Sequence, residues 1–277
     1  MRLDKFFQGF GNTAEAPAMP KVFEPTFLNR LEERFQNCAK FEVDVMQPTF
    51  MFGISSVTSG AVHKTFQIKN SEGWKPTKIL KVELEQKRTL TLMGSSRWLD
   101  GLAPDYAVVC AGKPPDALST LLLGEADKKS TLKGAILNPA NATLSPDHKG
   151  RQFMFQERLI SQCPFRQRMG YIYSFLTNNR MIIFTRSRRH RTKRGEVELI
   201  EEASIEVTMA TGWPYLWRLL NAPPTTLGYD PPIVHLNGNK LDLTAVLGVG
   251  AQGTCYKGTI TTGNKTTNVA VKLSAHE

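Results

Sequence analysis

Three glycines and a lysine near the end of the chain have a spacing suited to phosphate binding. Gly248, Gly250 and Gly253 form a G-x-G-x-x-G pattern, and Lys272 closes a later Val-Ala-Val-Lys run. Glycines let backbone N–H groups approach phosphate oxygens closely, and a lysine adds a positive charge. The same glycine pattern occurs in dinucleotide-binding turns, but those require a helix directly afterwards. Here β-prone residues follow, so the pattern predicts a glycine loop between two strands.

A second set of residues suited to chemistry lies in the middle of the chain. Pro104-Asp105 introduces one apolar run, and Glu125 follows the next. Carboxylates at the ends of adjacent strands can converge on one point, and hard cations such as Mg²⁺ prefer oxygen ligands. A nearby lysine, Lys128, would orient a water or stabilise a phosphate in the transition state. The alternative is two ordinary strand-end acids at the surface.

The excess positive charge is concentrated in one segment. Residues 151–194 contain eleven Arg or Lys residues and a single acid, Glu157, which accounts for the whole formal net charge of +10. Such a basic block indicates contact with a nucleic-acid backbone or a nuclear-import signal. A solvated basic loop between two strands is the alternative. Its densest part contains Arg186, Arg188, Arg189, Arg191, Lys193 and Arg194.

Composition restricts the class of protein. A hydrophobic content of 41% suits a folded chain. No window reaches the roughly 18 apolar residues of a membrane span, and the first residues lack the apolar core of a secretory signal. The four cysteines lie far apart without a C-x-x-C, which argues against a zinc knuckle or disulfide framework. We expect an intracellular protein without a membrane span, located in the nucleus if the basic block is an import signal.

Hydrophobic periodicity predicts the elements that position these residues. Helical spacing is found at residues 23–39, at 151–162 and around Trp213 and Trp217. Residues 1–20 predict a loose arm, and residues 130–147 predict a loop. Residues 89–93 suit a short strand or a turn of helix. Strands are expected at 41–45, 61–68, 79–84, 102–110, 117–123, 169–175, 181–185 and 196–209.

This order of elements, with its Pro-Asp and Glu, resembles the restriction-endonuclease-like superfamily, whose motif is P-D followed by (D/E)-x-K. Asp105 and Glu125 match the motif. Asp127 stands where the lysine is expected, and Lys128 comes one residue late. Because a shift of one residue along a strand turns a side chain to the other face, the resemblance implies two alternatives. One is a working Mg²⁺ site of Asp105, Glu125 and Lys128; the other is a degenerate site in a domain that only binds.

The superfamily resemblance also implies supporting residues from two helices. An acid from the first helix often completes the site, and Glu32 or Glu33 has the right place in the order of elements. A glutamine on the second helix is frequent in that superfamily. Gln156 and Gln162 are the residues of this type in the second predicted helix.

The glycine loop and its lysine resemble the opening of a protein kinase small lobe. The resemblance implies that Gly248, Gly250 and Gly253 contact the phosphates of ATP, and that Lys272 pairs with the α- and β-phosphates. Gln252 departs from the usual residue types. The five residues after Lys272 contain no αC glutamate, H-R-D or D-F-G. We therefore expect ATP binding only with a complete kinase domain, and no phosphoryl transfer by this segment alone.

Crinkler-type effectors and fungal-type kinases have segments that join a nuclease-like domain to a kinase domain, and three stretches of this chain resemble them: 162–184, 212–220 and 227–231. The Crinkler header motif is absent. The predicted fold class is α/β (α+β). We expect an arm (1–20), a restriction-endonuclease-like mixed sheet flanked by helices (21–200), a connector (201–238), and a partial kinase N-lobe of three antiparallel strands (239–277).

Two functions follow from these resemblances. The first is a Crinkler-like effector, a fragment of a nuclease-like and protein-kinase fusion with an ATP-binding glycine loop, acting inside a host cell. The second is a non-catalytic module that binds nucleic acid or a host target and carries a degenerate nuclease site.

Overall fold

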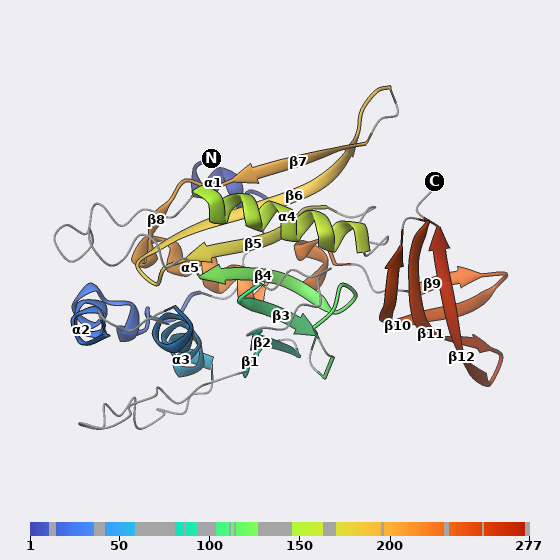
Figure 1. The fold of residues 1–277 in the computed structure, drawn as a ribbon, viewed down its shortest axis with the longest axis horizontal. Helices are drawn as coiled ribbons and strands as arrows, with labels where there is room; N and C mark the ends of the chain where they lie inside the picture. Colours follow the sequence, from blue (N-terminus) through green and yellow to red (C-terminus); the bar gives the residue numbers. More distant parts are fainter. Residues whose placement is uncertain are drawn as a thin grey trace.

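Two β-sheets organise the chain in a computed structural model (Figure 1). A larger sheet with helices on both faces occupies most of the molecule, and a smaller sheet is formed by the last strands. The structure describes residues 1–10, 15–35, 42–58, 81–85, 87–93, 104–110, 112–113, 115–126, 146–162, 170–194, 197–229, 233–250 and 252–274.

The larger sheet is mixed and mostly antiparallel. Its strand order is β1-β2-β3-β4-β5-β6-β7, and β8 pairs with β6. Among the described strands, β4 and β5 alone pair in parallel, and helix α4 connects them along the chain. The strands are β1 (Lys81–Leu84), β2 (Arg88–Leu92), β3 (Tyr106–Cys110), β4 (Thr120–Ala126), β5 (Ile172–Thr177), β6 (Met181–Arg191), β7 (Val197–Ala203) and β8 (Val207–Thr208).

Alternating side chains give the sheet two buried faces. Along β3, Tyr106 and Val108 belong to one hydrophobic cluster, whereas Ala107 and Val109 belong to another. The first cluster is covered by α1 (Leu3–Phe6), η1 (Lys21–Phe23), α3 (Gln47–Thr58) and α5 (Met209–Asn221). The second is covered by α4 (Pro146–Gln162). Both faces of these strands are therefore removed from water, which explains their nearly continuous apolar sequence.

The first ten residues pack into the core, which differs from the loose arm expected there. Helix α1 buries Leu3 and Phe6, and the rings of Phe7 and Phe10 lie edge-on to Phe184 and Tyr173 with centroids 5.0 and 5.1 Å apart. Phenylalanines at this spacing cover the sheet although the helix is too short to show periodicity in the sequence.

Residues 41–45 were expected to form a strand, and that prediction is wrong. Residues 42–46 form the π-helix η2 (Glu42–Met46), which continues into α3. Val45 and Met46 are buried against Leu28 and Leu31 of α2 (Pro25–Phe35). Helix α2 confirms the first predicted helix within the described residues. The strand expected at 61–68 and most of the loop expected at 130–147 lie outside the described residues.

The remaining elements differ from expectation mainly at their ends. Residues 89–92 lie in strand β2, which was one of the two alternatives for 89–93. Strand β6 extends into the basic run as far as Arg191, where a loop between two strands was one alternative. Helix α5, placed in the expected connector, buries Trp213 and Leu216 in the core of the larger sheet. Residues 201–227 are therefore part of this fold rather than a connector alone.

The smaller sheet has four antiparallel strands in the order β12-β11-β10-β9, one more than expected. They are β9 (Ile233–Leu236), β10 (Asn239–Gly250), β11 (Gly253–Thr262) and β12 (Lys265–Ser274), and the short helix η5 (Pro224–Leu227) precedes them. Leu241, Leu243 and Tyr256 of this sheet share a buried cluster with Phe155 and Leu159 of α4. One face of the smaller sheet is thus packed near α4.

Candidate functional site

Asp105 and Glu125 meet at one end of the strand pair β3–β4. Asp105 directly precedes β3, and Glu125 is the penultimate residue of the antiparallel β4, which brings the start of one strand to the end of the other. The Asp105 Oδ2 atom accepts a hydrogen bond of 2.7 Å from the backbone N–H of Ala126, the residue after Glu125. The convergence expected from the sequence is therefore present in the structure.

A glutamine from α3 fixes the other oxygen of Asp105. The Gln47 side-chain amide donates to Asp105 Oδ1 at 2.8 Å, and Gln47 itself is buried. With both carboxylate oxygens engaged, Asp105 has one orientation. Gln47 lies at the junction of η2 and α3, so the helical structure that replaces the expected strand is what delivers this contact.

Glu125 is enclosed and paired with an arginine from α4. Only 1% of Glu125 is exposed, and its Oε1 atom lies 2.7 Å from a guanidinium nitrogen of Arg151. Its other oxygen, Oε2, is buried without a hydrogen-bond partner in the described part of the chain. A buried carboxylate oxygen without a partner is costly, because the charge is removed from water without compensation. This oxygen is thus available to a further cation or donor.

Burial raises the pKa of both carboxyl groups. The pKa of Asp105 rises to about 7, chiefly through loss of solvent, while the Ala126 N–H and Arg151 oppose the rise. The pKa of Glu125 rises to about 9, again chiefly through loss of solvent and then through the nearby charge of Asp105, with Arg151 opposing it. Near neutral pH the pair therefore retains protons that isolated carboxyl groups would lose.

The acid that joins this pair is Glu42, and the sequence analysis did not select it. Glu42 of η2 is close enough to raise the pKa of both Asp105 and Glu125. The expected acids lie on α2: Glu33 is exposed, and Glu32 is buried in an ion pair with Arg180. Among the described residues, no group of three or more His, Cys, Asp or Glu side chains has the arrangement of a metal site.

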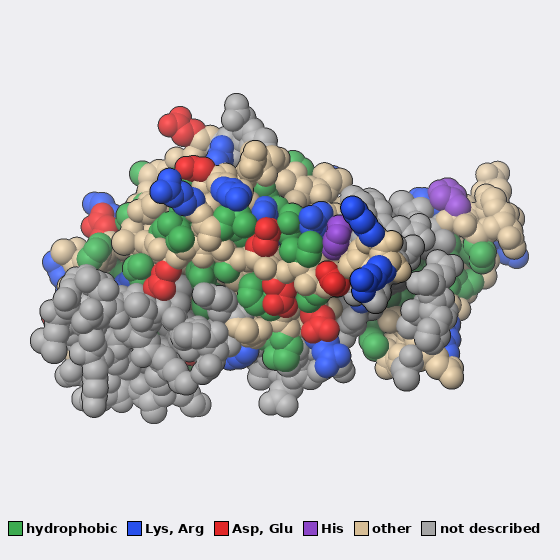
Figure 2. Space-filling model, turned by 90° about the horizontal axis from the view of Figure 1, so that it is seen from above, with side chains coloured by type: hydrophobic (Ala, Val, Ile, Leu, Met, Phe, Trp, Pro, Cys, Tyr) green, Lys and Arg blue, Asp and Glu red, His purple; other side chains and the backbone are tan. Residues whose placement is uncertain are grey.

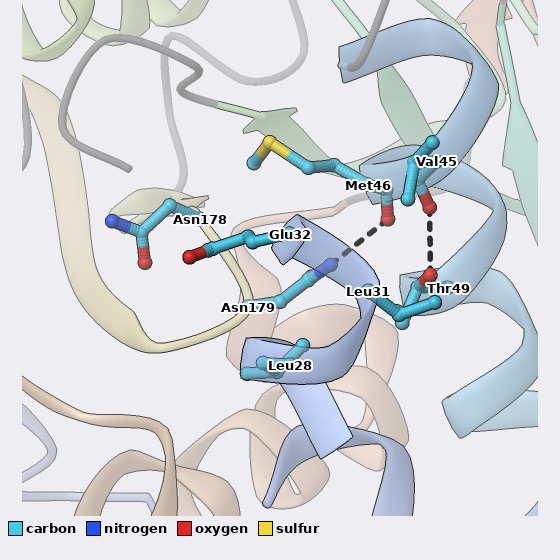
Figure 3. Close-up of a pocket in the computed structure, with 8 residues that line it drawn as sticks. All are labelled: Leu28, Leu31, Glu32, Val45, Met46, Thr49, Asn178 and Asn179. Atoms are coloured by element: carbon cyan, nitrogen blue, oxygen red, sulfur yellow. Dashed lines mark hydrogen bonds between the residues drawn. The ribbon is translucent and has the colours of Figure 1, made fainter. Parts of the chain in front are cut away.

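Figure 3 shows where Glu32 lies instead. It lines a small pocket between α2, the η2–α3 junction and the β5–β6 turn, together with Asn178 and Asn179. Asn179 donates its side-chain amide to the carbonyl of Met46 at 2.9 Å. This contact ties the turn to the helical segment that carries Glu42 and Gln47, so the pocket supports the carboxylate site rather than forming part of it.

Of the two expected glutamines, Gln156 is buried in a hydroxyl network rather than at the carboxylates. Its amide nitrogen donates to Ser174 and Thr185 at 2.6 and 3.0 Å, and its oxygen accepts from Ser187. The side chain of Gln162 and the whole of Asp127 and Lys128 lie outside the described residues. Arg151 and Gln47 were not selected from the sequence. The sequence does contain one indication of Arg151, since it is a basic residue at the start of the predicted helix.

The basic segment divides into buried and exposed parts. Arg186 is buried: its Nε atom lies 2.6 Å from Glu202, and its guanidinium lies 4.0 Å from the centre of the Tyr171 ring. Arg188 also stacks on Tyr171, at 4.9 Å. These contacts hold Arg186 inside the protein, where it cannot reach a nucleic acid. The part still suited to that role is formed by the half-buried Arg189 and the exposed Lys193 and Arg194; the side chain of Arg191 lies outside the described set.

Acidic residues stand opposite the basic strand. In the β6–β7 pair, Arg186 faces Glu202, Ser187 faces Glu201 and His190 faces Glu198. Figure 2 shows Lys and Arg side chains dispersed among Asp and Glu on the face that it presents. The far ends of β6 and β7 form an arm, the β6–β7 arm, that extends beyond the rest of the sheet (Figure 1). Among the described side chains of this strand pair, the exposed lysine and arginine, Lys193 and Arg194, lie in the turn after β6.

The glycine pattern lies at the turn between β10 and β11. Gly248 faces Cys255, Gly250 faces Gly253, and Lys272 of β12 also faces Cys255 from the other side. Gly253 has a φ of 132°, which side chains rarely permit. Exposed Lys272 donates to the Gln252 side chain at 3.4 Å, so the lysine reaches toward the glycine turn.

Comparisons with protein-family models, with curated proteins and with solved structures find no match to this chain. None of the helices in the described ranges is both long and apolar enough to cross a membrane.

Proposed function

We propose that the larger sheet carries a Mg²⁺-dependent site that hydrolyses nucleic-acid phosphodiesters, in a domain of the restriction-endonuclease-like class. One observation carries the proposal: Asp105 and Glu125 converge at the end of neighbouring strands, where burial leaves both with raised pKa values. Two buried carboxylates kept together at such a cost are a common feature of functional sites. The β3-β4-α4-β5 order, with parallel β4 and β5, supports the class.

The donor set fits a hard divalent cation. Among the described residues, Glu125 Oε2 has no hydrogen-bond partner and each Asp105 oxygen accepts one hydrogen bond, which leaves lone pairs for a cation. Mg²⁺ is commonly bound by one or two carboxylates and retains several waters. Asp105 and Glu125 would hold it, with Glu42 nearby. When bound, such an ion polarises a phosphoryl oxygen and acidifies a coordinated water.

The residues of the chain itself have separate roles in this proposal. Gln47 and the Ala126 N–H orient Asp105. Lys128, which follows β4, would stabilise the negative charge that develops on the phosphate. The burial of Glu125 keeps bulk water from competing for the site.

Cleavage of supercoiled and linear DNA with Mg²⁺ tests this function. Asp105→Asn and Glu125→Gln retain the shapes of the side chains but remove their charges, so we expect each to reduce cleavage at least about a hundredfold. Glu33→Gln, on the exposed side of α2, is the matched control and should cleave like the wild type. Cleavage that persists in both site variants would show that Asp105 and Glu125 are not the catalytic carboxylates.

A second proposed function is nucleotide binding by the glycine turn. It is favoured by exposed Lys272, which reaches Gln252 within the turn. In the composite Crinkler-type architecture proposed from the sequence, this sheet would hold the phosphates of ATP and leave catalysis to the rest of a kinase domain. Loss of one charge-assisted contact by Lys272→Ala should weaken ATP binding about tenfold.

Lys257→Ala is the matched control for that measurement. Lys257 is exposed and faces Ala270, two residues before Lys272 on the same strand, so it lies on the same side of the sheet. Calorimetric titration with ATP compares the two variants. Equal affinities in both variants and the wild type would show that Lys272 takes no part in binding ATP.

The non-catalytic alternative is supported by the turn of the β6–β7 arm. Lys193 and Arg194 are exposed in the turn that follows β6, where nucleic-acid phosphates or an import receptor could reach them. In this proposal the module acts by binding a nucleic acid or a host protein, and the carboxylates belong to a degenerate, inactive nuclease site. The DNA cleavage assay with the two site variants separates it from the first proposal.

A further inference from the structure

Arg151 lies where a cation would be expected in the carboxylate site. Its guanidinium is 2.7 Å from Glu125 Oε1, and it lowers the pKa values of both Asp105 and Glu125 against the larger effect of burial. The two partners differ sharply in exposure: 44% of the Arg151 side chain is exposed, against 2% of that of Glu125. The arginine therefore lies between the buried carboxylate and solvent.

The arginine has a second contact on its own helix. Its guanidinium carbon lies 5.6 Å from the centre of the Phe155 ring, one turn farther along α4. A guanidinium attracted to an aromatic face retains part of its stabilisation when an ion pair opens. Because the side chain is partly exposed and long, it can leave Glu125 without any movement of the helix backbone.

We propose that Arg151 is the resident counter-cation of this site, and that a divalent cation binds Asp105 and Glu125 only as Arg151 leaves Glu125. This inference rests on the proposed metal site. Two positive charges a few ångströms apart repel strongly in a partly buried site, so the guanidinium and the metal ion compete for the same carboxylate. The protein alone should therefore bind a divalent cation weakly.

The phosphate backbone of a nucleic acid is the partner that would release the arginine. A guanidinium forms paired hydrogen bonds with phosphate oxygens, and its planar shape suits that geometry. Arg151 at the exposed mouth of the site would move from Glu125 to a bound phosphate and leave both carboxylates for the metal. Nucleic acid and metal should then strengthen the binding of each other by the same factor.

Manganese binding, followed by electron paramagnetic resonance, tests this role without using activity. Arg151→Met removes the charge and keeps an unbranched side chain against Phe155. We expect it to bind Mn²⁺ at least about tenfold more tightly than the wild type. Arg158→Met is the matched control, because it removes the same charge two turns farther along the same helix; its affinity should stay within about twofold of the wild type.

A second titration measures the coupling to nucleic acid. A short phosphorothioate duplex, with the binding of Mn²⁺ to DNA alone subtracted, should tighten Mn²⁺ binding to the wild type and to Arg158→Met. It should have little effect on Arg151→Met, in which no competition remains to be relieved. Arg151→Lys, which keeps the charge on a group less suited to phosphate, should show an intermediate coupling.

The outcomes distinguish this inference from the function on which it rests. Equal or weaker Mn²⁺ binding by Arg151→Met, when the wild type binds and Glu125→Gln does not, overturns the role of Arg151 and leaves the metal site standing. A coupling to DNA that is unchanged in Arg151→Met also overturns it. If neither the wild type nor Arg151→Met binds Mn²⁺, both the metal site and this inference fail.

Discussion

Arg180 of the β5–β6 turn donates to Oε1 of Glu32 on α2 at 3.1 Å, and another of its guanidinium nitrogens lies 3.0 Å from Oε2; both side chains are more than nine-tenths buried. Arg180 also donates to Asn29 at 2.8 Å. The pKa of Glu32 is nevertheless raised, because the loss of solvent outweighs the attraction of Arg180. This pair therefore fixes the position of α2 against the sheet at a considerable cost in desolvation.

Breaking this pair should cost more stability than replacing it. Arg180→Met leaves Glu32 buried without its cation and should lower the free energy of unfolding by about 3 kcal/mol. The double variant Glu32→Leu with Arg180→Met removes both charges, and its stability should lie within about 1 kcal/mol of the wild type. Urea denaturation of the wild type, both single variants and the double variant measures the coupling. A double variant as unstable as the two single losses combined would contradict the expectation.

The stability of the protein should fall as pH rises through the neutral range. The carboxyls of Asp105 and Glu125 have folded-state pKa values of about 7 and about 9, above their ordinary values of 3.8 and 4.5. The folded state thus binds more protons than the unfolded state between about pH 4 and pH 9. Under these conditions the free energy of unfolding decreases with rising pH.

Denaturation at about pH 5 and about pH 9 measures this effect. We expect the wild type to lose at least about 2 kcal/mol between the two conditions, since each pKa unit corresponds to 1.36 kcal/mol. Glu125→Gln removes one of the two groups and should flatten the dependence. Exposed Glu33→Gln should behave like the wild type. A wild type more stable at the higher pH would show that the pair is ionised at no cost in the folded state.

Two glutamines on α4 should respond in opposite ways to loss of their amides. Gln152 is fully buried, and its amide nitrogen and oxygen both lack hydrogen-bond partners in the described part of the chain. Gln156, one turn later, is also fully buried but contacts three hydroxyl groups. Gln152→Leu should stabilise the protein by about 1 kcal/mol, because it removes an uncompensated polar group.

Gln156→Leu should destabilise the protein by about 2 kcal/mol, since it leaves buried hydroxyl groups of Ser174, Thr185 and Ser187 short of a partner. Thermal unfolding monitored by circular dichroism compares the two variants, which carry the same substitution on the same helix. Destabilisation by Gln152→Leu as large as that by Gln156→Leu would mean that the first amide has a partner in the folded protein.

The sequence predicted the convergence of Asp105 and Glu125, because Asp105 precedes one apolar run, Glu125 follows the next, and antiparallel strands bring the start of one strand to the end of the other. It did not predict Arg151 and Glu42 as their neighbours. Arg151 reaches Glu125 from a helix that lies across the sheet, and a contact of this kind depends on the packing of α4 rather than on spacing along the chain. Glu42 lies in an alternating apolar and polar stretch that suits a strand, yet it forms a π-helix.

The burial of Val45 and Met46 against α2 explains why the helical structure prevails there. Five residues with alternating polarity do not distinguish a strand from a helical segment that buries only its last two side chains. The basic run was similarly ambiguous. Its arginines suited a solvated loop as well as a binding surface, but Arg186 pairs with Glu202 across a regular strand pair and stacks on Tyr171. Partners on a neighbouring strand cannot be read from a local count of charges.

The exposed turn of the β6–β7 arm should contribute the part of nucleic-acid binding that depends on salt. Replacing Lys193 and Arg194 with glutamate removes two exposed positive charges, while Arg186 stays buried. If both contact phosphates, the slope of log affinity against log salt concentration should decrease by about 2. Lys257→Glu with Lys265→Glu, two exposed lysines of the smaller sheet, makes the same change of charge elsewhere and should leave the slope nearly unchanged. Fluorescence anisotropy with a labelled duplex at several salt concentrations measures the slope, and equal slopes for both double variants would exclude the arm from the interface.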